Sequence, residues 1–185
     1  KIVYREYIQN SVDSLENAVS IGLLEPQSMR IDIVVNAEES YISIRDNGTG
    51  IPTESAANTL MNVGSSKKRN SNNRGFRGIG RLGGMSYCDT LVFTTSAENE
   101  TAKTIVTFDC KKLRHLLVPG EYEDMSLSAV LEEITTVESL PEKAEKHYLC
   151  VEMRGVNGFS DLLDIDAAKS YISQVAPVPY QSRHF

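Results

Sequence analysis

Apolar residues recur every three or four positions from Tyr4 to Leu23, and the strand-like runs that follow do not alternate strictly with helices. The repeat predicts one long amphipathic helix over residues 4–24, ended by Pro26. A parallel doubly wound sheet would need a helix between successive strands. The observed order of segments therefore favours an α+β fold, a two-layer sandwich with a mixed, mainly antiparallel sheet.

The remaining elements follow from shorter patterns. Runs rich in β-branched residues predict strands at 31–35 and 41–45, which resemble a hairpin, and at 90–95, 104–108 and 149–153. Short helices are predicted after Pro52 and over 165–175. The acidic segment 119–147 is expected to be an insertion with one short helix, carried by Leu127, Val130, Leu131 and Ile134. At 185 residues the chain 1–185 is expected to be a single domain, excised from a longer protein.

Charge and cysteine content narrow the function classes. The net charge of −6 argues against direct binding of nucleic acid by this domain, although residues 65–84 carry six basic side chains and no acidic one. No stretch approaches the roughly 18 apolar residues of a membrane span, so we expect a soluble protein with no membrane partner. Three scattered cysteines exclude a disulfide scaffold and are typical of a reducing cytoplasm.

The first predicted helix carries a polar stripe beside its apolar one. Its members, spaced 4, 3 and 4 residues apart, are Glu6, Asn10, Asp13 and Asn17. A carboxylate one turn from a carboxamide suits a general base beside a ligand of Mg²⁺, which prefers oxygen donors and keeps waters and phosphate oxygens in its shell. The same spacing also occurs on any solvent-facing helix surface.

Two glycine-containing segments could approach a ligand closely. Asp46, Gly48, Gly50 and Ile51 follow a predicted strand, where the glycines permit a tight turn and the aspartate can accept a hydrogen bond from an exocyclic amine. An ordinary turn would have the same composition. The second segment, 75–84, contains five of the twelve glycines and follows a basic loop. Successive unobstructed N–H groups there would form a site for a polyphosphate.

The order of these motifs resembles the GHKL ATPases, which include gyrase, the ninety-kilodalton heat-shock chaperone, sensor histidine kinases and the MutL mismatch-repair proteins. The matching positions are Glu6-x-x-x-Asn10-x-x-Asp13, then Asp46-x-Gly48-x-Gly50, then Gly75-x-x-Gly78-x-Gly80. The first motif is most similar to the chaperone, and Gly75-Phe76-Arg77-Gly78 is more similar to mismatch repair. The family fold, the Bergerat ATP-binding fold, agrees with the predicted order of elements.

The resemblance implies roles for these residues. Glu6 would activate the attacking water, and Asn10 would hold Mg²⁺. Asp46 would bind the adenine amine of ATP or ADP, with Gly50 and Ile51 lining the base pocket. A mobile lid over 64–75 would close on the triphosphate. The cradle for the phosphates would be the segment Gly75, Phe76, Arg77, Gly78, Ile79 and Gly80.

The resemblance also leaves choices open. The family usually has a threonine in a late strand that supports the adenine aspartate, and Tyr148-Leu149-Cys150-Val151 has none, so that support must come from elsewhere. The leading hypothesis is an Mg²⁺-dependent ATPase of the chaperone and mismatch-repair branch, coupled to a nucleotide-dependent homodimer or a downstream domain. The alternatives are a protein kinase of the sensor-histidine type and a nucleotide-gated interaction module without turnover.

Overall fold

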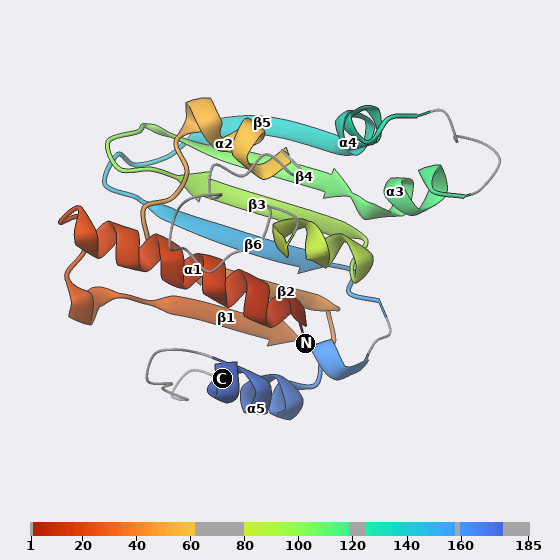
Figure 1. Ribbon diagram of the computed structural model, residues 1–185, viewed down its shortest axis with the longest axis horizontal. Helices are drawn as coiled ribbons and strands as arrows, with labels where there is room; N and C mark the ends of the chain where they lie inside the picture. Colours follow the sequence, from red (N-terminus) through yellow and green to blue (C-terminus); the bar gives the residue numbers. More distant parts are fainter. Residues whose placement is uncertain (1, 62–79, 119–124, 158–159, 176–185) are drawn as a thin grey trace.

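The six strands that the structure describes join in one sheet. They are β1 (Ile31–Asn36), β2 (Tyr41–Asp46), β3 (Thr90–Ser96), β4 (Ala102–Asp109), β5 (Thr135–Pro141) and β6 (Tyr148–Arg154). Their order across the sheet is β1-β2-β6-β3-β4-β5 (Figure 1). The computed structural model describes residues 2–61, 80–118, 125–157 and 160–175. Within these ranges every pair of neighbouring strands is antiparallel, which agrees with the mainly antiparallel sheet predicted from the sequence.

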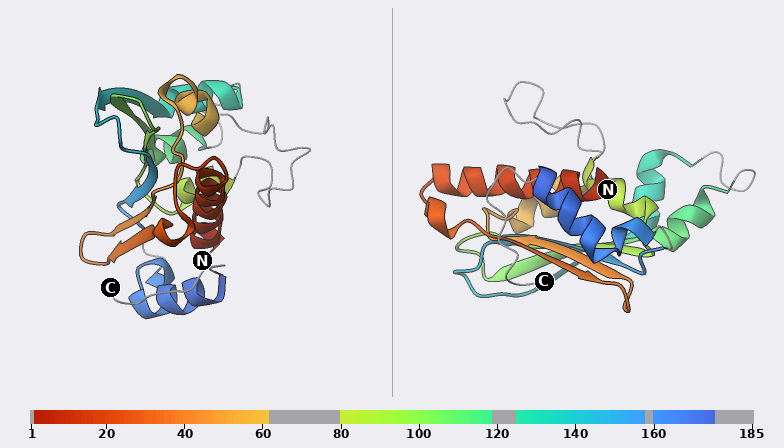
Figure 2. Two further views of the ribbon diagram at one scale, coloured as in Figure 1. Left: turned by 90° about the vertical axis from the view of Figure 1, so that its left-hand side faces the viewer. Right: turned by 90° about the horizontal axis from the view of Figure 1, so that it is seen from below.

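The α-helices lie on one side of this sheet (Figure 2). They are α1 (Ile2–Ser20), α2 (Thr53–Met61), α3 (Cys110–Leu116), α4 (Leu127–Ile134) and α5 (Ile165–Val175), with short 3-10 helices η1 (Pro26–Ser28), η3 (Gly80–Ser86) and η4 (Ser160–Leu162). The predicted two-layer α+β sandwich is therefore confirmed. Among the described helices, none combines the length and the apolar character needed to cross a membrane.

Alternating side chains of the four central strands form the core between the two layers. They are Ile42 and Ile44 of β2, Val151 and Met153 of β6, Leu91 and Phe93 of β3, and Val106 and Phe108 of β4, all buried. The strand register places them in rows across the sheet, because Ile44 lies opposite Val151, and Val151 lies opposite Phe93. Helix α1 covers these rows, and the ring of Tyr7 meets that of Phe93 edge to face, with centroids 6.3 Å apart.

Helix α1 ends at Ser20, so the predicted extent to residue 24, with Pro26 as the stop signal, is wrong. Gly22 has a φ of +75°, in the left-handed region that favours glycine. The N–H groups of Gly22 and of the next residue donate to the carbonyls of Val19 and Ala18, at 3.0 and 2.9 Å. This pair of hydrogen bonds is a Schellman motif, which satisfies the last carbonyls of a helix. The glycine, not the proline, therefore stops the helix.

The acidic segment after α4 also differs from expectation. The predicted short helix is α4, but residues 135–141 form strand β5, which pairs with β4 from Thr135 opposite Phe108 to Pro141 opposite Ala102. The segment expected to be an insertion with one short helix therefore also contributes a strand to the sheet, which its sequence did not indicate. Strand β5 is an edge strand whose residues after Thr135 are all exposed. Its pairing rests on backbone hydrogen bonds to β4 and needs no alternating apolar pattern.

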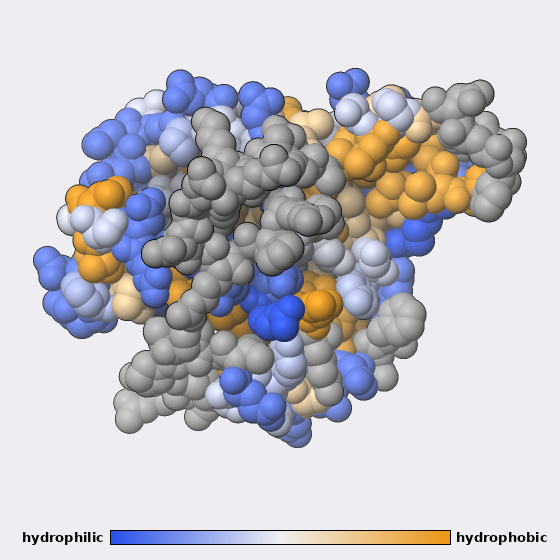
Figure 3. Space-filling model, in the orientation of Figure 1, coloured by the Kyte–Doolittle hydropathy of each residue, from blue (hydrophilic) through white to orange (hydrophobic). Residues whose placement is uncertain are grey.

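Apolar side chains are exposed around α3 and α4, where Figure 3 shows an apolar surface. Leu117 and Val118, directly after α3, and Leu127, at the start of α4, are 65%, 48% and 60% exposed. The buried side of α4 carries Val130, Leu131 and Ile134. The two helices thus close one end of the core while leaving part of their apolar surface in contact with solvent.

Candidate functional site

The polar stripe of α1 lies at the edge of the buried layer. Glu6, Asn10 and Asp13 are all half-buried, whereas Asn17 is exposed. The side chain of Glu6 is 32% exposed, and its Oε1 lies 3.5 Å from the guanidinium of Arg5. Three of the four predicted positions are therefore partly withdrawn from solvent, as a site on this helix would require.

Asp46 ends strand β2 and is almost fully buried, with 2% of its surface exposed. Its Oδ1 accepts the N–H of Gly48 at 2.9 Å, while Oδ2 has no hydrogen-bond partner in the described part of the chain. Burial raises the pKa of the carboxyl to about 6, although the Gly48 N–H and the nearby hydroxyls of Ser11 and Ser14 favour its charged form. Because an unpaired buried oxygen is costly, Oδ2 is suited to accept a donor from a ligand.

The turn after Asp46 is held by side chains from two other parts of the chain. Ser14 Oγ of α1 accepts the N–H of Thr49 at 3.1 Å. The ring of His147 donates from Nδ1 to the carbonyl of Gly48 at 2.8 Å, since a carbonyl oxygen can only accept. A Cβ on Gly48 would lie 2.2 Å from Ser14 Oγ. The predicted close approach at this glycine is thus an approach to α1.

Position 50 also requires a residue without a side chain, but for a different reason. Its φ is +64°, and a Cβ there would lie 1.9 Å from the carbonyl oxygen of Ser96. The next residue, Ile51, donates its N–H to Thr95 Oγ1 at 2.7 Å, and that hydroxyl donates to the carbonyl of Tyr148 at 3.0 Å. The turn is therefore bound to β3 and to the start of β6, and its shape is fixed before any ligand arrives.

The strand register shows what lies beside Asp46. Leu149 of β6 is opposite Asp46 on one side and opposite Thr95 of β3 on the other. An apolar side chain thus occupies the position next to the aspartate, as the absence of a threonine from residues 148–151 led us to expect. The hydroxyls near the carboxylate instead come from helix α1, at Ser11 and Ser14.

Gly80 brings the third motif to the first one. It begins η3, and a Cβ on it would lie 2.1 Å from Oε2 of Glu6 and 3.0 Å from its Cδ. The predicted cradle residues Gly75, Phe76, Arg77, Gly78 and Ile79, and the predicted lid over 64–75, lie outside the described residues. Of the glycine-rich motif, the structure therefore describes the end that touches α1.

Glu100 is a structural residue that sequence analysis did not single out. Its carboxylate, in the β3–β4 connection, accepts the backbone N–H of Thr53 at 3.0 and 3.1 Å and the Thr53 hydroxyl at 2.8 Å. Thr53 is the first residue of α2, where unpaired N–H groups favour an acceptor with negative charge. The β3–β4 hairpin therefore fixes the turn after Asp46, through Thr95, and the start of α2, through Glu100.

The described part of the site extends along helix α1. From Ser14 beside Asp46 to Glu6 beside Gly80 the helix advances eight residues, about 12 Å at 1.5 Å per residue. The amide oxygen of half-buried Asn10 lies between these ends and is a hard donor of the kind Mg²⁺ takes. Among the described residues no group of three or more His, Cys, Asp or Glu side chains could hold a metal by itself. The donor set fits an ion that takes most of its ligands from phosphate and water.

Comparison with known families gives one match. Residues 1–136 match the model of a family described as histidine kinase-, DNA gyrase B-, and HSP90-like ATPase. The matched range includes α1, the turn after Asp46 and the glycine-rich segment that ends at Gly80. No curated protein matches the chain.

Proposed function

Because the chain belongs to the family of histidine kinase-, DNA gyrase B- and HSP90-like ATPases, we propose that it is an Mg²⁺-dependent domain that binds and hydrolyses ATP. The observation that carries the proposal is the buried Oδ2 of Asp46, an acceptor without a partner among the described residues, beside a rigid glycine turn. The exocyclic amine of adenine supplies the donor that this oxygen lacks. Gly50 and Ile51 then lie along the base.

At the other end of α1 the side chains suit attack on the terminal phosphate. Glu6 accepts a proton from a water molecule, whose oxygen forms a bond to the γ-phosphorus. The bond from that phosphorus to the β–γ bridging oxygen breaks, and ADP leaves. Asn10 would hold Mg²⁺, which neutralises charge on the phosphates when it is bound. Glu6 is partly exposed at 32%, so water can reach it.

The finer features of the proposal come from the resemblance. Asp13 belongs to the first motif, and Gly75, Phe76, Arg77, Gly78, Ile79 and Gly80 form the phosphate cradle under a lid over 64–75. We place the chain in the chaperone and mismatch-repair branch, with lid closure coupled to a homodimer or a downstream domain. The three cysteines are free thiols, which agrees with a reducing cytoplasm as the location.

The deciding experiment compares Glu6→Ala with Glu16→Ala, a control on an exposed position of the same helix. ATP binding is measured by calorimetry, and turnover by phosphate release. We expect Glu6→Ala to bind ATP nearly like the parent and to lose about 10²- to 10⁴-fold in turnover, the range for a general base. Undiminished hydrolysis in Glu6→Ala would show that Glu6 is not the general base.

The same assays separate the alternatives. A sensor-histidine type of kinase would transfer labelled phosphate from ATP to a protein without an equal amount of free phosphate. A nucleotide-gated interaction module would bind ATP and ADP with saturation and release no phosphate. Either result in the parent protein would replace hydrolysis as the activity.

A further inference from the structure

Tyr7 connects the helix that carries Glu6 to the 3-10 helix that begins at Gly80. Its side chain is 2% exposed, and its hydroxyl donates to the carbonyl of Arg81 at 2.9 Å. The same oxygen accepts the N–H of Gly84 at 3.1 Å. The hydroxyl of Tyr7 thus binds two successive turns of η3, and Tyr7 directly follows Glu6 in the chain.

The bridge is rigid at the tyrosine end. The ring lies edge to face against Phe93, at an interplanar angle of 81°, so the sheet fixes its orientation. Burial raises the pKa of Tyr7, which keeps the hydroxyl protonated and therefore a donor to Arg81. Gly84 fits closely against this group, because a Cβ there would lie 2.4 Å from the hydroxyl oxygen.

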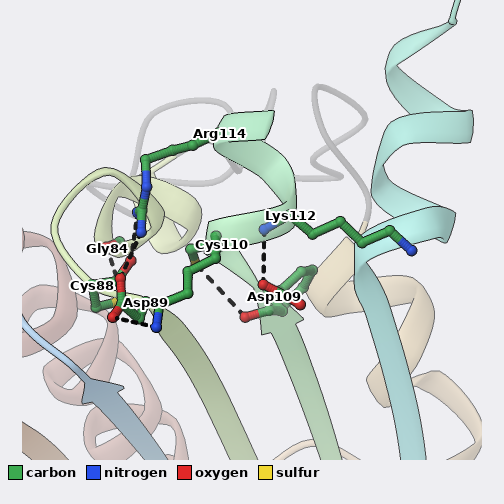
Figure 4. Close-up of polar contacts among 9 residues, drawn as sticks. Gly84, Cys88, Asp89, Asp109, Cys110, Lys112 and Arg114 are labelled. Carbon is green, nitrogen blue, oxygen red and sulfur yellow. Dashed lines mark hydrogen bonds and ion pairs between the residues drawn. The ribbon is translucent and has the colours of Figure 1, made fainter. Parts of the chain in front are cut away.

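The far end of η3 is anchored independently of Tyr7 (Figure 4). Cys88 Sγ donates to the carbonyl of Gly84 at 3.3 Å. Arg114 of α3 donates to the carbonyl of Cys88 at 2.9 Å and to Asp89 Oδ1 at 2.6 Å. These contacts hold the exit of the 3-10 helix against the sheet and α3. Its beginning, at Gly80, lies against Glu6 of α1.

We propose that Tyr7 is a positioning residue that sets the separation between the carboxylate of Glu6 and the backbone at Gly80. The inference rests on the proposed function, since it concerns the end of the site where the terminal phosphate of ATP lies. The side chain of Tyr7 is 2% exposed, so Tyr7 has almost no surface with which to contact a ligand. It acts through the backbone of Arg81 and Gly84.

Tyr7→Phe removes the bridging hydroxyl and keeps the ring. Tyr4→Phe is the matched control, because Tyr4 lies three residues earlier on the same helix, is 0% exposed, and donates its hydroxyl to the carbonyl of Leu162 at 2.6 Å, in η4. Both variants delete one buried hydroxyl, so both are expected to lower the melting temperature to a similar degree. A general effect on folding would therefore appear in both.

The expected difference lies in the kinetics. Tyr7→Phe should lower kcat for ATP hydrolysis by about 10- to 100-fold, the scale of a small misplacement of a reacting group. Its affinity for ADP should change less than about threefold, because the turn after Asp46 is held by Ser14, Thr95 and His147 and not by Tyr7. Tyr4→Phe should keep kcat and ADP affinity near the parent values.

The outcomes distinguish this inference from the proposed function. If the parent protein neither binds nor hydrolyses ATP, the proposed function fails. If the parent is active and Tyr7→Phe matches Tyr4→Phe in kcat, the positioning role is overturned. Should Tyr7→Phe not fold, Gly84→Ala displaces the same hydroxyl from the other side, and a normal kcat in that variant would equally contradict the inference.

Discussion

Gly80 lies against the carboxylate of Glu6, so closely that a Cβ on the glycine would be 2.1 Å from Oε2. The two residues are far apart in the sequence, and each belongs to a different motif. The contact is with the far end of a flexible side chain, so a larger residue at position 80 would move the carboxylate and leave the backbone in place. A substitution at Gly80 therefore tests whether hydrolysis depends on the position of the Glu6 carboxylate.

Gly80→Ala should therefore lower turnover more than stability. We expect about a 10- to 100-fold fall in kcat, with the melting temperature near that of the parent. Gly83→Ala is the control in the same 3-10 helix, since a Cβ there meets nothing within 4 Å. A Gly80→Ala protein with parental kcat would show that Glu6 can leave this position without consequence.

Asp46→Asn should affect nucleotide affinity and stability in opposite directions. Asparagine must present a donor in the pocket, so ATP and ADP should both bind about 10- to 100-fold more weakly, a loss of roughly 1.5–3 kcal/mol. Removing a buried charge should stabilise the ligand-free domain by about 1–2 kcal/mol at pH 8. Calorimetry measures the change in affinity and urea denaturation the change in stability. The control is Asp32→Asn on β1, where the side chain is 47% exposed. Equal affinity in Asp46→Asn would place the adenine elsewhere.

The pKa of Asp46 predicts how these effects change with pH. Because its pKa is raised from 3.8 to about 6 in the folded domain, the neutral carboxyl contributes stability that is fully present below pH 3.8. That contribution is lost as the pH rises through 6. The stability advantage of Asp46→Asn should therefore shrink between pH 8 and pH 5, and ADP affinity of the parent should fall below pH 6. If the difference in unfolding free energy between Asp46→Asn and the parent stayed constant from pH 8 to pH 5, Asp46 would not carry a buried charge that titrates near pH 6.

His147 should contribute to nucleotide affinity, because it holds the turn after Asp46 in place. His147→Ala removes the donor to the Gly48 carbonyl and should weaken ADP binding by about 3- to 10-fold, the value of one hydrogen bond. His147→Asn places an N–H donor near the position of Nδ1 and should recover most of the loss. His115→Ala, at an exposed position of α3, is the control. Identical affinities for the Ala and Asn variants would rule out the hydrogen bond as the cause.

The sequence predicts the elements whose pattern depends on burial. The apolar repeat of α1 and the β-branched runs of the central strands are visible because each buries one face against the core. Strand β5 escapes notice, since Val137 and Leu140 are its only large apolar side chains, and they are 48% and 42% exposed. Its conformation comes from β4, and a pattern within the segment cannot report a neighbour's hydrogen bonds.

The same distinction applies to the candidate site. Asp46, Gly48 and Gly50 can be identified locally because a turn needs those residue types in that order. The roles of Tyr7 and His147 cannot, because their hydrogen-bond partners are 74 and 99 residues away in the chain. A buried tyrosine in an apolar stripe looks like any other core residue until the topology brings a backbone to its hydroxyl.

The central place of β6 has a consequence for synthesis of the protein. This strand lies between β2 and β3 although it follows both by more than fifty residues in the chain. A nascent chain that has not yet delivered residues 148–154 contains two separate pieces of sheet, each with an unpaired inner edge. Asp46 and Thr95 come onto one surface only when β6 is inserted between them. Until then the two sides of the candidate site are not joined through β6, and the ribosome-bound chain carries two edges that can pair with other strands. Premature termination before this strand should therefore give aggregation instead of a smaller folded domain.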